Sequence, residues 1–229
     1  MPSEPQPRRG ALRVLLIGGV ETRFHHFDEL RPVLARVIGN TGASCTPLLA
    51  SEALRPEVLG RFDAIVSITT GGTLDEAAES ALLGAVAENR NDAGRPVHFL
   101  GMHGASCSFS NSPRYAEMLG GRFLRHPPMD RFRVEIDATD HPVSVGVDAF
   151  DIHDELYLLE LCSPVRVLLS AWHAEAGDPM PARRVPLGWA RAYGEGKVCY
   201  VALGHGPEQI EHPSLKRLIR QTLDWFRDE

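Results

Sequence analysis

His103 lies at the centre of a short glycine-rich motif that follows an apolar segment. The apolar segment is Val97–Leu100, and the motif Gly-Met-His-Gly-Ala covers residues 101–105. A short buried strand that runs into such a turn and then a helix is typical of a nucleophile elbow, which holds its central side chain at the carboxyl edge of a sheet. Hydrolases place Ser at this position and glutaminases place Cys. Because the chain has an imidazole there, we expect a function that uses His103 without the usual covalent nucleophile.

Other histidines follow other predicted strands. His25 and His26 come after the first predicted strand, and His205 lies between two glycines after the last one. In an open α/β sheet the ligand site lies outside the carboxyl ends of the strands, so we expect these imidazoles to meet His103 there. Such a group can bind a divalent metal ion or transfer protons near neutral pH. The segment Asp154–Tyr157 adds carboxylates and a phenol.

Each of these residues also has a purely structural interpretation. His103 could cap the next helix, and His205 could belong to a glycine turn. His25 and His26 are adjacent, so at most one of them is expected to face a given site. His126 precedes two prolines and is most simply interpreted as part of a rigid turn.

The first half of the chain alternates strands with helices. Apolar runs predict strands, and apolar residues at helical spacing predict helices between them. Thr73 and Glu76 have the spacing of a capping box, and Ser112-Pro113 followed by Gly120 marks the start and end of a helix. We predict an α/β fold with a mostly parallel, doubly wound sheet and helices on both faces. The strands are expected at 12–17, 44–49, 64–69 and 96–102, and the first helix at about 28–38.

The second half has shorter predicted strands and one long segment that reads as loop, residues 137–163. These strands are expected to extend the same sheet, with a flap at 174–184 over its edge. A last helix is expected to open at His212-Pro213. Residues 1–10 are interpreted as a disordered tail and residues 11–229 as a single domain. The predicted strands of this half lie at 132–136, 165–170, 187–192 and 198–203.

Composition narrows the class of protein. The chain has 229 residues, a net charge of −6, and 43% hydrophobic and 24% charged residues. Binding to nucleic acid or to an anionic membrane needs clustered Lys and Arg, so neither partner is expected. No apolar run is long enough to span a bilayer. The four cysteines are dispersed, which is typical of reduced thiols and of a cytoplasmic protein.

Several motifs together resemble the trehalose-utilisation (ThuA-like) family over about residues 12–227. They are the elbow at 101–105, Tyr115, Leu119–Phe123, His126–Pro128, Asp154–Tyr157, Trp189–Arg191, Tyr193–Val198 and Ala202–His205. The resemblance implies the fold of class I glutamine amidotransferases, a flavodoxin-like three-layer sandwich without the elbow cysteine. It also implies sugar metabolism through 3-keto sugar intermediates, and a divalent metal in some members.

The resemblance assigns positions to individual residues. His103 falls at the elbow, Glu155 in the Asp-Glu-Leu-Tyr motif and His205 in the Leu-Gly-His motif. His25 or His26 corresponds to a histidine-bearing loop after the first strand. Many relatives carry Gly-Gly-His close to that strand end, whereas residues 20–24 intervene here.

We therefore expect a sugar-metabolism enzyme that acts on a keto-sugar or keto-glycoside by isomerisation, elimination or hydrolysis. A carbonyl acidifies the neighbouring C–H, so the reaction needs a base and a cation or donor at the enolate oxygen. The expected catalytic residues are His103, Glu155 and His205. The expected ligands of a divalent metal such as Zn are His26, His103 and His205, and the expected sugar-pocket residues are Tyr115, Tyr157 and Trp189.

The alternatives belong to other classes. A non-catalytic ligand-binding or accessory module on a glutaminase-like fold would explain the missing cysteine. A glutaminase would need a thiolate at the elbow, which position 103 does not supply. No dinucleotide fingerprint is present, so neither nicotinamide nor flavin is expected. A homo-oligomer is compatible with the sequence.

Overall fold

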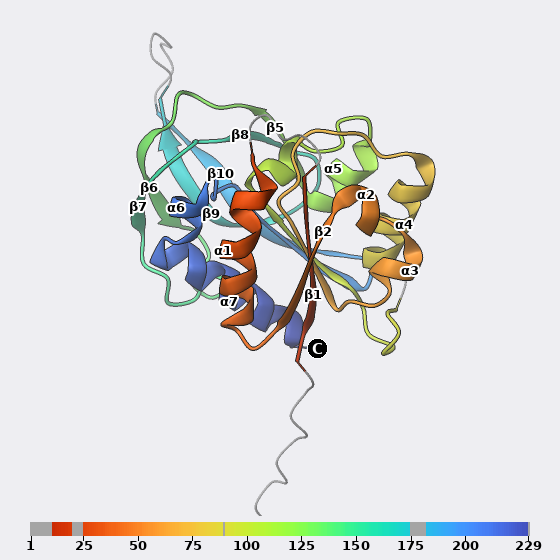
Figure 1. Cartoon of the computed structure of the whole chain (residues 1–229). Helices are drawn as coiled ribbons and strands as arrows, with labels where there is room; N and C mark the ends of the chain where they lie inside the picture. Colours follow the sequence, from red (N-terminus) through yellow and green to blue (C-terminus); the bar gives the residue numbers. More distant parts are fainter. Residues whose placement is uncertain (1–10, 20–24, 89, 175–181, 229) are drawn as a thin grey trace, which may run out of the picture.

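A mixed nine-stranded sheet organises the chain in the computed structural model, which describes residues 11–19, 25–88, 90–174 and 182–228. The strand order is β2-β1-β3-β4-β11-β10-β9-β6-β7, and Figure 1 shows the whole chain. The first five of these strands are parallel, and their order is the 2-1-3-4-5 order of flavodoxin-like folds. These strands are β1 (Arg13–Gly18), β2 (Ser44–Leu49), β3 (Ala64–Ser67), β4 (His98–Met102) and β11 (Gly196–Val201).

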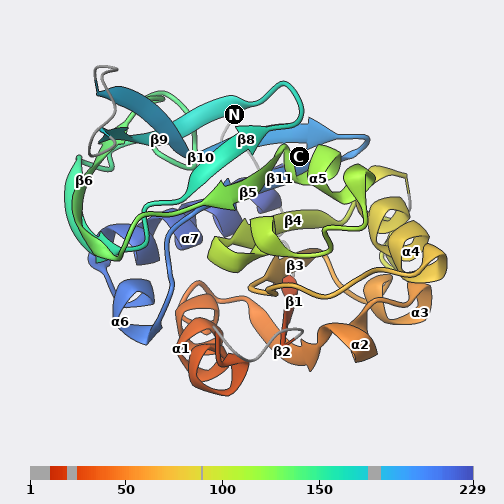
Figure 2. The ribbon, with the colours of Figure 1, turned by 90° about the horizontal axis from the view of Figure 1, so that it is seen from above.

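Helices cover both faces of the parallel strands, as Figure 2 shows from above. One group is formed by α1 (Phe27–Gly39), α6 (Pro207–Ile210) and α7 (Pro213–Arg227), which contact one another. The other group contains α3 (Pro56–Leu59), α4 (Glu76–Ala87) and α5 (Pro113–Leu119), and α2 (Ala50–Ala53) follows β2. The central strands are buried on both sides, which explains why they read as continuous apolar runs. The predicted α/β three-layer fold is confirmed.

The second half extends the sheet, as predicted, and in the structure the added edge strands run antiparallel. They are β10 (Arg183–Tyr193), β9 (Arg166–His173), β6 (Asp130–Ile136) and β7 (Phe150–Asp154). A separate ribbon pairs β5 (Gly121–Arg125) with β8 (Leu158–Leu161). The segment 137–163 was predicted as loop, and this is wrong because it contains β7 and β8. In β7 the inward positions include the charged Asp154, which hides the apolar alternation of a half-buried strand.

Helix boundaries agree with most of the sequence signals. The Ser112 hydroxyl accepts a hydrogen bond from the Tyr115 amide at 3.0 Å, and Gly120 ends α5 with φ of 95°. The predicted capping box at Thr73 is wrong. Asp75 is the N-cap of α4, because its carboxylate accepts from the Ala78 amide at 2.7 Å. The predicted tail at 1–10 and most of the predicted flap, residues 175–181, lie outside the described residues.

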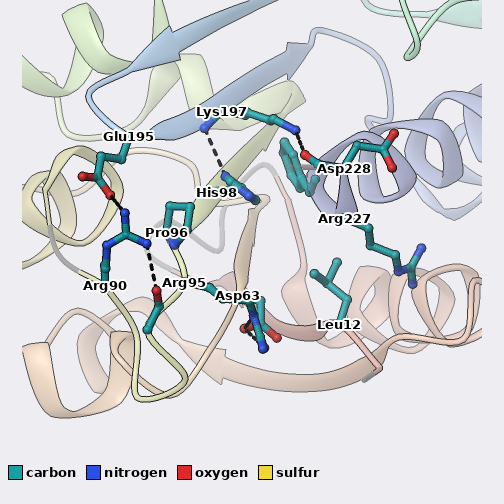
Figure 3. A pocket seen from close by; sticks show the side chains of 12 residues that line it. Leu12, Asp63, Arg90, Arg95, Pro96, His98, Glu195, Lys197, Arg227 and Asp228 are labelled. Atoms are coloured by element: carbon teal, nitrogen blue, oxygen red, sulfur yellow. Dashed lines mark hydrogen bonds and ion pairs between the residues drawn. The ribbon is translucent and has the colours of Figure 1, made fainter. Parts of the chain in front are cut away.

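A cavity of about 740 Å³ lies at the amino ends of the parallel strands, away from their carboxyl edge (Figure 3). Its wall includes Asp63, whose carboxylate accepts hydrogen bonds from Arg13 and Arg95. His98 lies beside it, only 7% exposed, and its Nδ1 accepts from the Lys197 amide at 3.1 Å. Burial, together with the nearby Lys197 charge, lowers the pKa of His98 to about 4.

This low pKa predicts a pH-dependent stability. The unfolded chain, with a histidine pKa of about 6.5, takes up the proton before the folded chain does. The His98 contribution is therefore present above about pH 6.5 and is lost as pH falls toward 4. His98→Asn keeps an acceptor near the Nδ1 position but has no proton to take up. Measured by urea unfolding, its free energy of unfolding should fall less steeply with decreasing pH than that of the wild type, by up to about 1.4 kcal/mol per pH unit. The exposed His153→Asn variant should keep the wild-type slope, and equal slopes for all three proteins would contradict the prediction.

Candidate functional site

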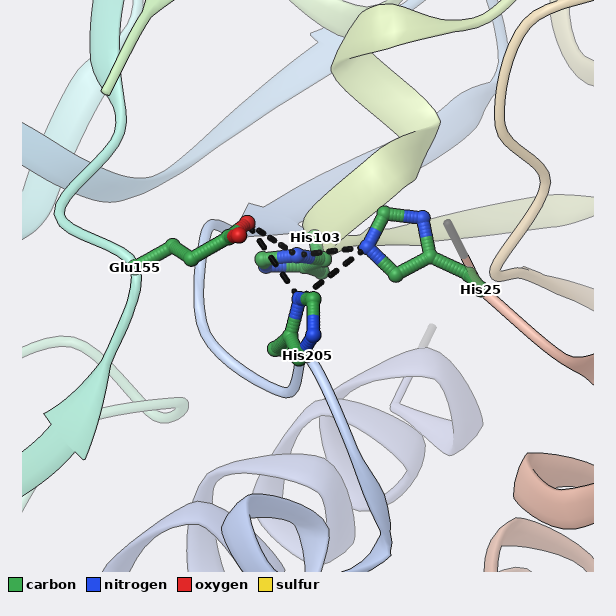
Figure 4. Close-up of side chains that lie close together, drawn as sticks. All are labelled: His25, His103, Glu155 and His205. Atoms are coloured by element: carbon green, nitrogen blue, oxygen red, sulfur yellow. Dashed lines mark hydrogen bonds and ion pairs between the residues drawn. The ribbon is translucent and has the colours of Figure 1, made fainter. Parts of the chain in front are cut away.

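Three imidazoles and one carboxylate meet at the carboxyl edge of the parallel strands (Figure 4). His25 follows β1, His103 follows β4 and His205 follows β11, so each comes from a different parallel strand. Glu155 follows β7 of the antiparallel half. One ligand atom from each of the four residues lies within 4.8 Å of the others. The convergence predicted from the strand ends is therefore present in the structure.

His103 occupies a strained backbone conformation at the end of β4. Its φ is 41°, a left-handed value that is uncommon for a residue with a side chain, and it opens the 3-10 turn η1 (His103–Cys107). Gly104 follows it because a Cβ there would lie 2.0 Å from the Thr70 hydroxyl. The predicted elbow is thus observed, with a fully buried His103 side chain at its apex.

The hydrogen bonds of His103 determine which nitrogen faces the cluster. Its Nδ1 lies 2.8 Å from the Ala202 carbonyl, which can only accept, so Nδ1 carries the proton. In the neutral ring Nε2 is then an acceptor. This atom lies 2.9 Å from the Tyr157 hydroxyl, 3.1 Å from His25 Nε2 and 3.3 Å from Glu155 Oε2.

His25 is held in a similar way. Its Nδ1 is 2.7 Å from the Thr70 hydroxyl, and its Nε2 is 3.2 Å from His205 Nδ1. Burial and the neighbouring His103 and His205 lower the pKa of His25 to about 3. His25 is therefore a neutral imidazole at physiological pH, which is the form that binds metals.

Glu155 joins the histidines through one carboxylate oxygen. Its Oε2 is 3.3 Å from both His103 Nε2 and His205 Nδ1. Burial raises the pKa of Glu155, but the close contacts of its carboxylate with the His103 and His205 rings outweigh burial and hold the pKa well below the usual range. The same interaction raises the pKa of His205. Glu155 is therefore ionised at neutral pH.

The cluster could hold a metal ion. Lone pairs of neutral imidazoles repel one another at contact distance unless a proton or a cation lies between them. The N···N distances of 3.1 and 3.2 Å and the N···O distances of 3.3 Å are close to the ~3.3 Å that separates two ligands of a tetrahedral zinc ion with bonds of about 2.0–2.1 Å. The residues present thus fit a small divalent ion in donor type, and four of their separations match its ligand spacing within a group of atoms that lie within 4.8 Å of one another.

Asp154 connects the loop that carries Glu155 to the loop that carries His205. It is fully buried; its Oδ1 accepts from the Glu155 amide and its Oδ2 from the Gly204 amide, both at 2.8 Å. The first amide is that of Glu155 itself, and Gly204 directly precedes His205. The Asp154 carboxylate therefore fixes the separation of the two loops that carry them.

The structure corrects one of the predicted ligands. His25 lies in the cluster, whereas the predicted ligand His26 is exposed and lies outside it. His26 is the extended N-cap residue of α1, and successive side chains of an extended chain point in opposite directions. The sequence could not choose between them because the two histidines are adjacent and no motif in the residues before them, 20–24, distinguishes one from the other.

Two of the three predicted sugar-pocket residues belong to the core. Tyr115 is 2% exposed and donates its hydroxyl to the Ala105 carbonyl at 3.0 Å. Trp189 is fully buried and donates its indole N–H to the Leu119 carbonyl at 2.7 Å. Tyr115 therefore packs against the elbow turn and Trp189 against α5, and neither lines the cluster. Tyr157 does reach it, through the contact with His103.

Sequence patterns predicted neither Thr70, which contacts His25, nor His126 as part of the site. His126 Nε2 lies 3.6 Å from Glu155 Oε1, and its ring stacks on Tyr157 with centroids 5.8 Å apart. The turn formed by His126–Pro128 therefore ends beside the site. The only signal for this was the presence of these residues among the motifs of the family resemblance.

Comparison with known proteins identifies the family of the chain. A family model described as trehalose utilisation, ThuA, matches residues 13–226. The chain belongs to the ThuA family. A search of curated protein sequences found no match. Among the described residues, no helix has the length and apolar character needed to cross a bilayer.

Solved structures show the same fold at low identity. A putative ThuA-like protein from Parabacteroides merdae is 16% identical with a TM-score of 0.78, covering 94% of this chain and 89% of that one. A second from Bacteroides uniformis is 18% identical with a TM-score of 0.75, covering 98% and 95%. A glutamine amidotransferase from Thermotoga maritima is 15% identical with a TM-score of 0.55, covering 95% and 99%. These likenesses confirm the glutamine amidotransferase-like fold.

The Asp154 contacts predict a specific stability loss. In Asp154→Asn, an amide N–H₂ replaces one of the two acceptors and faces a buried backbone N–H that is then unpaired. We expect a loss of about 1–3 kcal/mol in the free energy of unfolding, measured by urea denaturation. Asp151→Asn is the matched control, because Asp151 lies on the same strand and is exposed. Equal stability of the two variants would contradict the role assigned to Asp154.

Proposed function

We propose that the protein is a sugar-metabolism enzyme that acts on a keto-sugar or keto-glycoside with the help of a divalent metal ion. The observation that carries this proposal is the grouping of three imidazole nitrogens and a carboxylate oxygen within 4.8 Å of one another, with four separations of 3.1, 3.2, 3.3 and 3.3 Å that suit zinc. Imidazole and carboxylate ligands favour a first-row ion over Mg²⁺. Membership of the trehalose-utilisation family supports the substrate class.

His25, His103 and His205 would hold the ion, which when bound would supply a Lewis acid for the carbonyl oxygen of the substrate. Glu155 is the candidate base. Its carboxylate is ionised at neutral pH, and because Oε2 contacts His103 and His205, Oε1 is left to accept the proton from the carbon next to the carbonyl. The electron pair of that C–H bond then forms the enolate. Isomerisation returns a proton to the neighbouring carbon, and elimination instead breaks the bond to the glycosidic oxygen.

Tyr157 is the candidate donor to developing negative charge. Burial raises the pKa of its hydroxyl, which therefore keeps its proton at neutral pH. The hydroxyl already lies at the cluster, 2.9 Å from His103 Nε2. If His103 Nε2 binds the metal ion, the Tyr157 hydroxyl is free to donate its hydrogen bond to an enolate oxygen.

Covalent glutaminase chemistry has no support in this arrangement. The cysteine nearest the elbow, Cys107, is half-buried, and burial raises the pKa of its thiol to about 11. It is therefore protonated at neutral pH and a poor nucleophile. The four dispersed free cysteines support a reducing, cytoplasmic location.

A binding module without turnover is the second candidate. The observation in its favour is the burial of His103 and His25, at 0% and 7% exposure, which limits the access of a substrate to these two ligands. Such a protein would bind the metal and the sugar but leave the sugar unchanged.

The adjacent histidines provide a matched test of the metal site. Wild-type protein should bind about one Zn²⁺ per chain, and zinc should raise the melting temperature because it binds the folded state. His25→Ala should weaken zinc affinity by more than about 100-fold, because it removes a ligand rather than a supporting group. His26→Ala should retain wild-type affinity. Competition with a chelating dye measures both, and equal affinities in the two variants would refute the assignment.

A second prediction addresses turnover. Zinc-loaded wild type should convert 3-keto-trehalose, followed by chromatography of the products, and Glu155→Gln should lower kcat by about 10²–10⁴-fold. The exposed Glu160→Gln variant is the control. Binding of the sugar without conversion by the wild type would favour the binding-module candidate. Full activity of Glu155→Gln would exclude Glu155 as the base.

A further inference from the structure

We propose that His126, together with the rings of Phe123 and Tyr157, forms the subsite that binds and orients a pyranose ring beside Glu155. This inference rests on the proposed function for its substrate class. It assigns a role to a turn that the sequence alone interprets as structural, and it names the residues that select the part of the sugar facing the base.

Exposure defines the direction from which a ligand reaches the cluster. The side chain of His103 is fully buried, that of Glu155 is 14% exposed, and those of His205 and His126 are 30% and 35% exposed. His25 is buried on the opposite side, against Thr70. Solvent therefore meets the cluster on the side of Glu155, His205 and His126, and a substrate must approach there.

The ring of His126 is fixed in a way that suits recognition of a hydroxyl group. Its Nδ1 lies 2.8 Å from the Pro127 carbonyl, which can only accept, so Nδ1 donates and Nε2 is an acceptor in the neutral ring. The two prolines that follow restrict the backbone and hence the position of the ring. The turn is thus rigid, and its rigidity holds a polar atom at the open side of the site.

His126 and Glu155 lie close enough for one ligand to contact both from the open side of the site. His126 Nε2 and Glu155 Oε1 are 3.6 Å apart, longer than a direct hydrogen bond. Glu155 Oε2 faces His103 and His205, so Oε1 is the oxygen directed to the approaching substrate. A sugar whose acidic C–H faces Oε1 presents the hydroxyl of the next carbon to His126 Nε2. His126 would then decide which C–H meets the base.

Aromatic rings supply the surface on which the sugar would lie. Phe123 and Tyr157 have centroids 4.5 Å apart, Phe123 and His126 5.8 Å, and the planes of His126 and Tyr157 are inclined by 24°. Phe123 and His126 are partly open to solvent, whereas Tyr157 supports them from the buried side. The faces of aromatic rings are electron-rich and attract the C–H bonds on the apolar face of a pyranose.

The test distinguishes the contribution of the His126 ring from that of its Nε2 atom and from any effect on the metal site. His126→Phe keeps a ring and removes the Nε2 acceptor, His126→Gln keeps a polar group and removes the ring, and His153→Phe is a control at an exposed histidine. The probes are zinc alone, measured by chelator competition, and trehalose with the zinc-loaded protein, measured by calorimetry. For turnover of 3-keto-trehalose, kcat and KM are measured separately.

We expect His126→Phe to keep zinc affinity within about twofold, and to weaken trehalose binding and raise KM roughly tenfold, the value of one lost hydrogen bond. His126→Gln should weaken trehalose binding less than His126→Phe does, because it keeps a polar group, but should still bind trehalose more weakly than the wild type. His153→Phe should match the wild type. Turnover with an unchanged KM in His126→Phe would overturn the subsite and leave the proposed function intact. A loss of zinc affinity in His126→Phe would also overturn it, because His126 would then act on the metal site. A wild-type protein that binds zinc but no sugar would overturn both the subsite and the sugar-enzyme function.

Discussion

The hydrogen bond from His103 Nδ1 to the Ala202 carbonyl determines how the whole site is arranged. It joins the ends of two neighbouring parallel strands, β4 and β11, across 99 residues of sequence. It fixes the tautomer of His103 and so directs the Nε2 lone pair toward His25, Glu155 and Tyr157. Without this bond the imidazole could rotate, and the other groups would have no common point to face. The strained φ of 41° at His103 is maintained because the turn is held at several points, including the bond from the Tyr200 hydroxyl to the His103 carbonyl.

The two halves of the chain make different contributions to the site. The parallel half is built from strands buried on both faces, and the three histidines follow the carboxyl ends of three of these strands. The antiparallel half and the β5–β8 ribbon deliver Glu155, Tyr157 and His126. Asp154 connects the halves through the Gly204 amide. The family shares its scaffold with glutamine amidotransferases, but the residue at the elbow differs, so the fold alone does not carry the chemistry over.

The features that the sequence predicted correctly are those with strong local patterns. Continuous apolar runs predicted the parallel strands, and the glycines around His103 predicted the elbow, since Gly101 and Gly104 leave no space for a Cβ. The convergence of His103, His205 and one of the pair His25–His26 followed from a geometric rule about parallel strands. That rule could not decide which of the two adjacent histidines faces the site, because the choice depends on the local backbone conformation at His25 and His26.

Long-range packing decided what the sequence could not. Tyr115 and Trp189 are amphipathic rings that suit a sugar pocket and a core equally well, and only the three-dimensional positions of Ala105 and Leu119 place their polar atoms in the core. Asp154 reads as a solvated acid, yet it is fully buried because two backbone amides from separate loops satisfy it. His126 precedes Glu155 by 29 positions, and only the ribbon of β5 and β8 brings them together. The residues closest to the open side of the site are therefore the ones that local patterns describe least. They come from the half of the molecule that surrounds the parallel strands rather than from the strands themselves. A change in substrate can thus arise in this half while the histidine cluster remains the same.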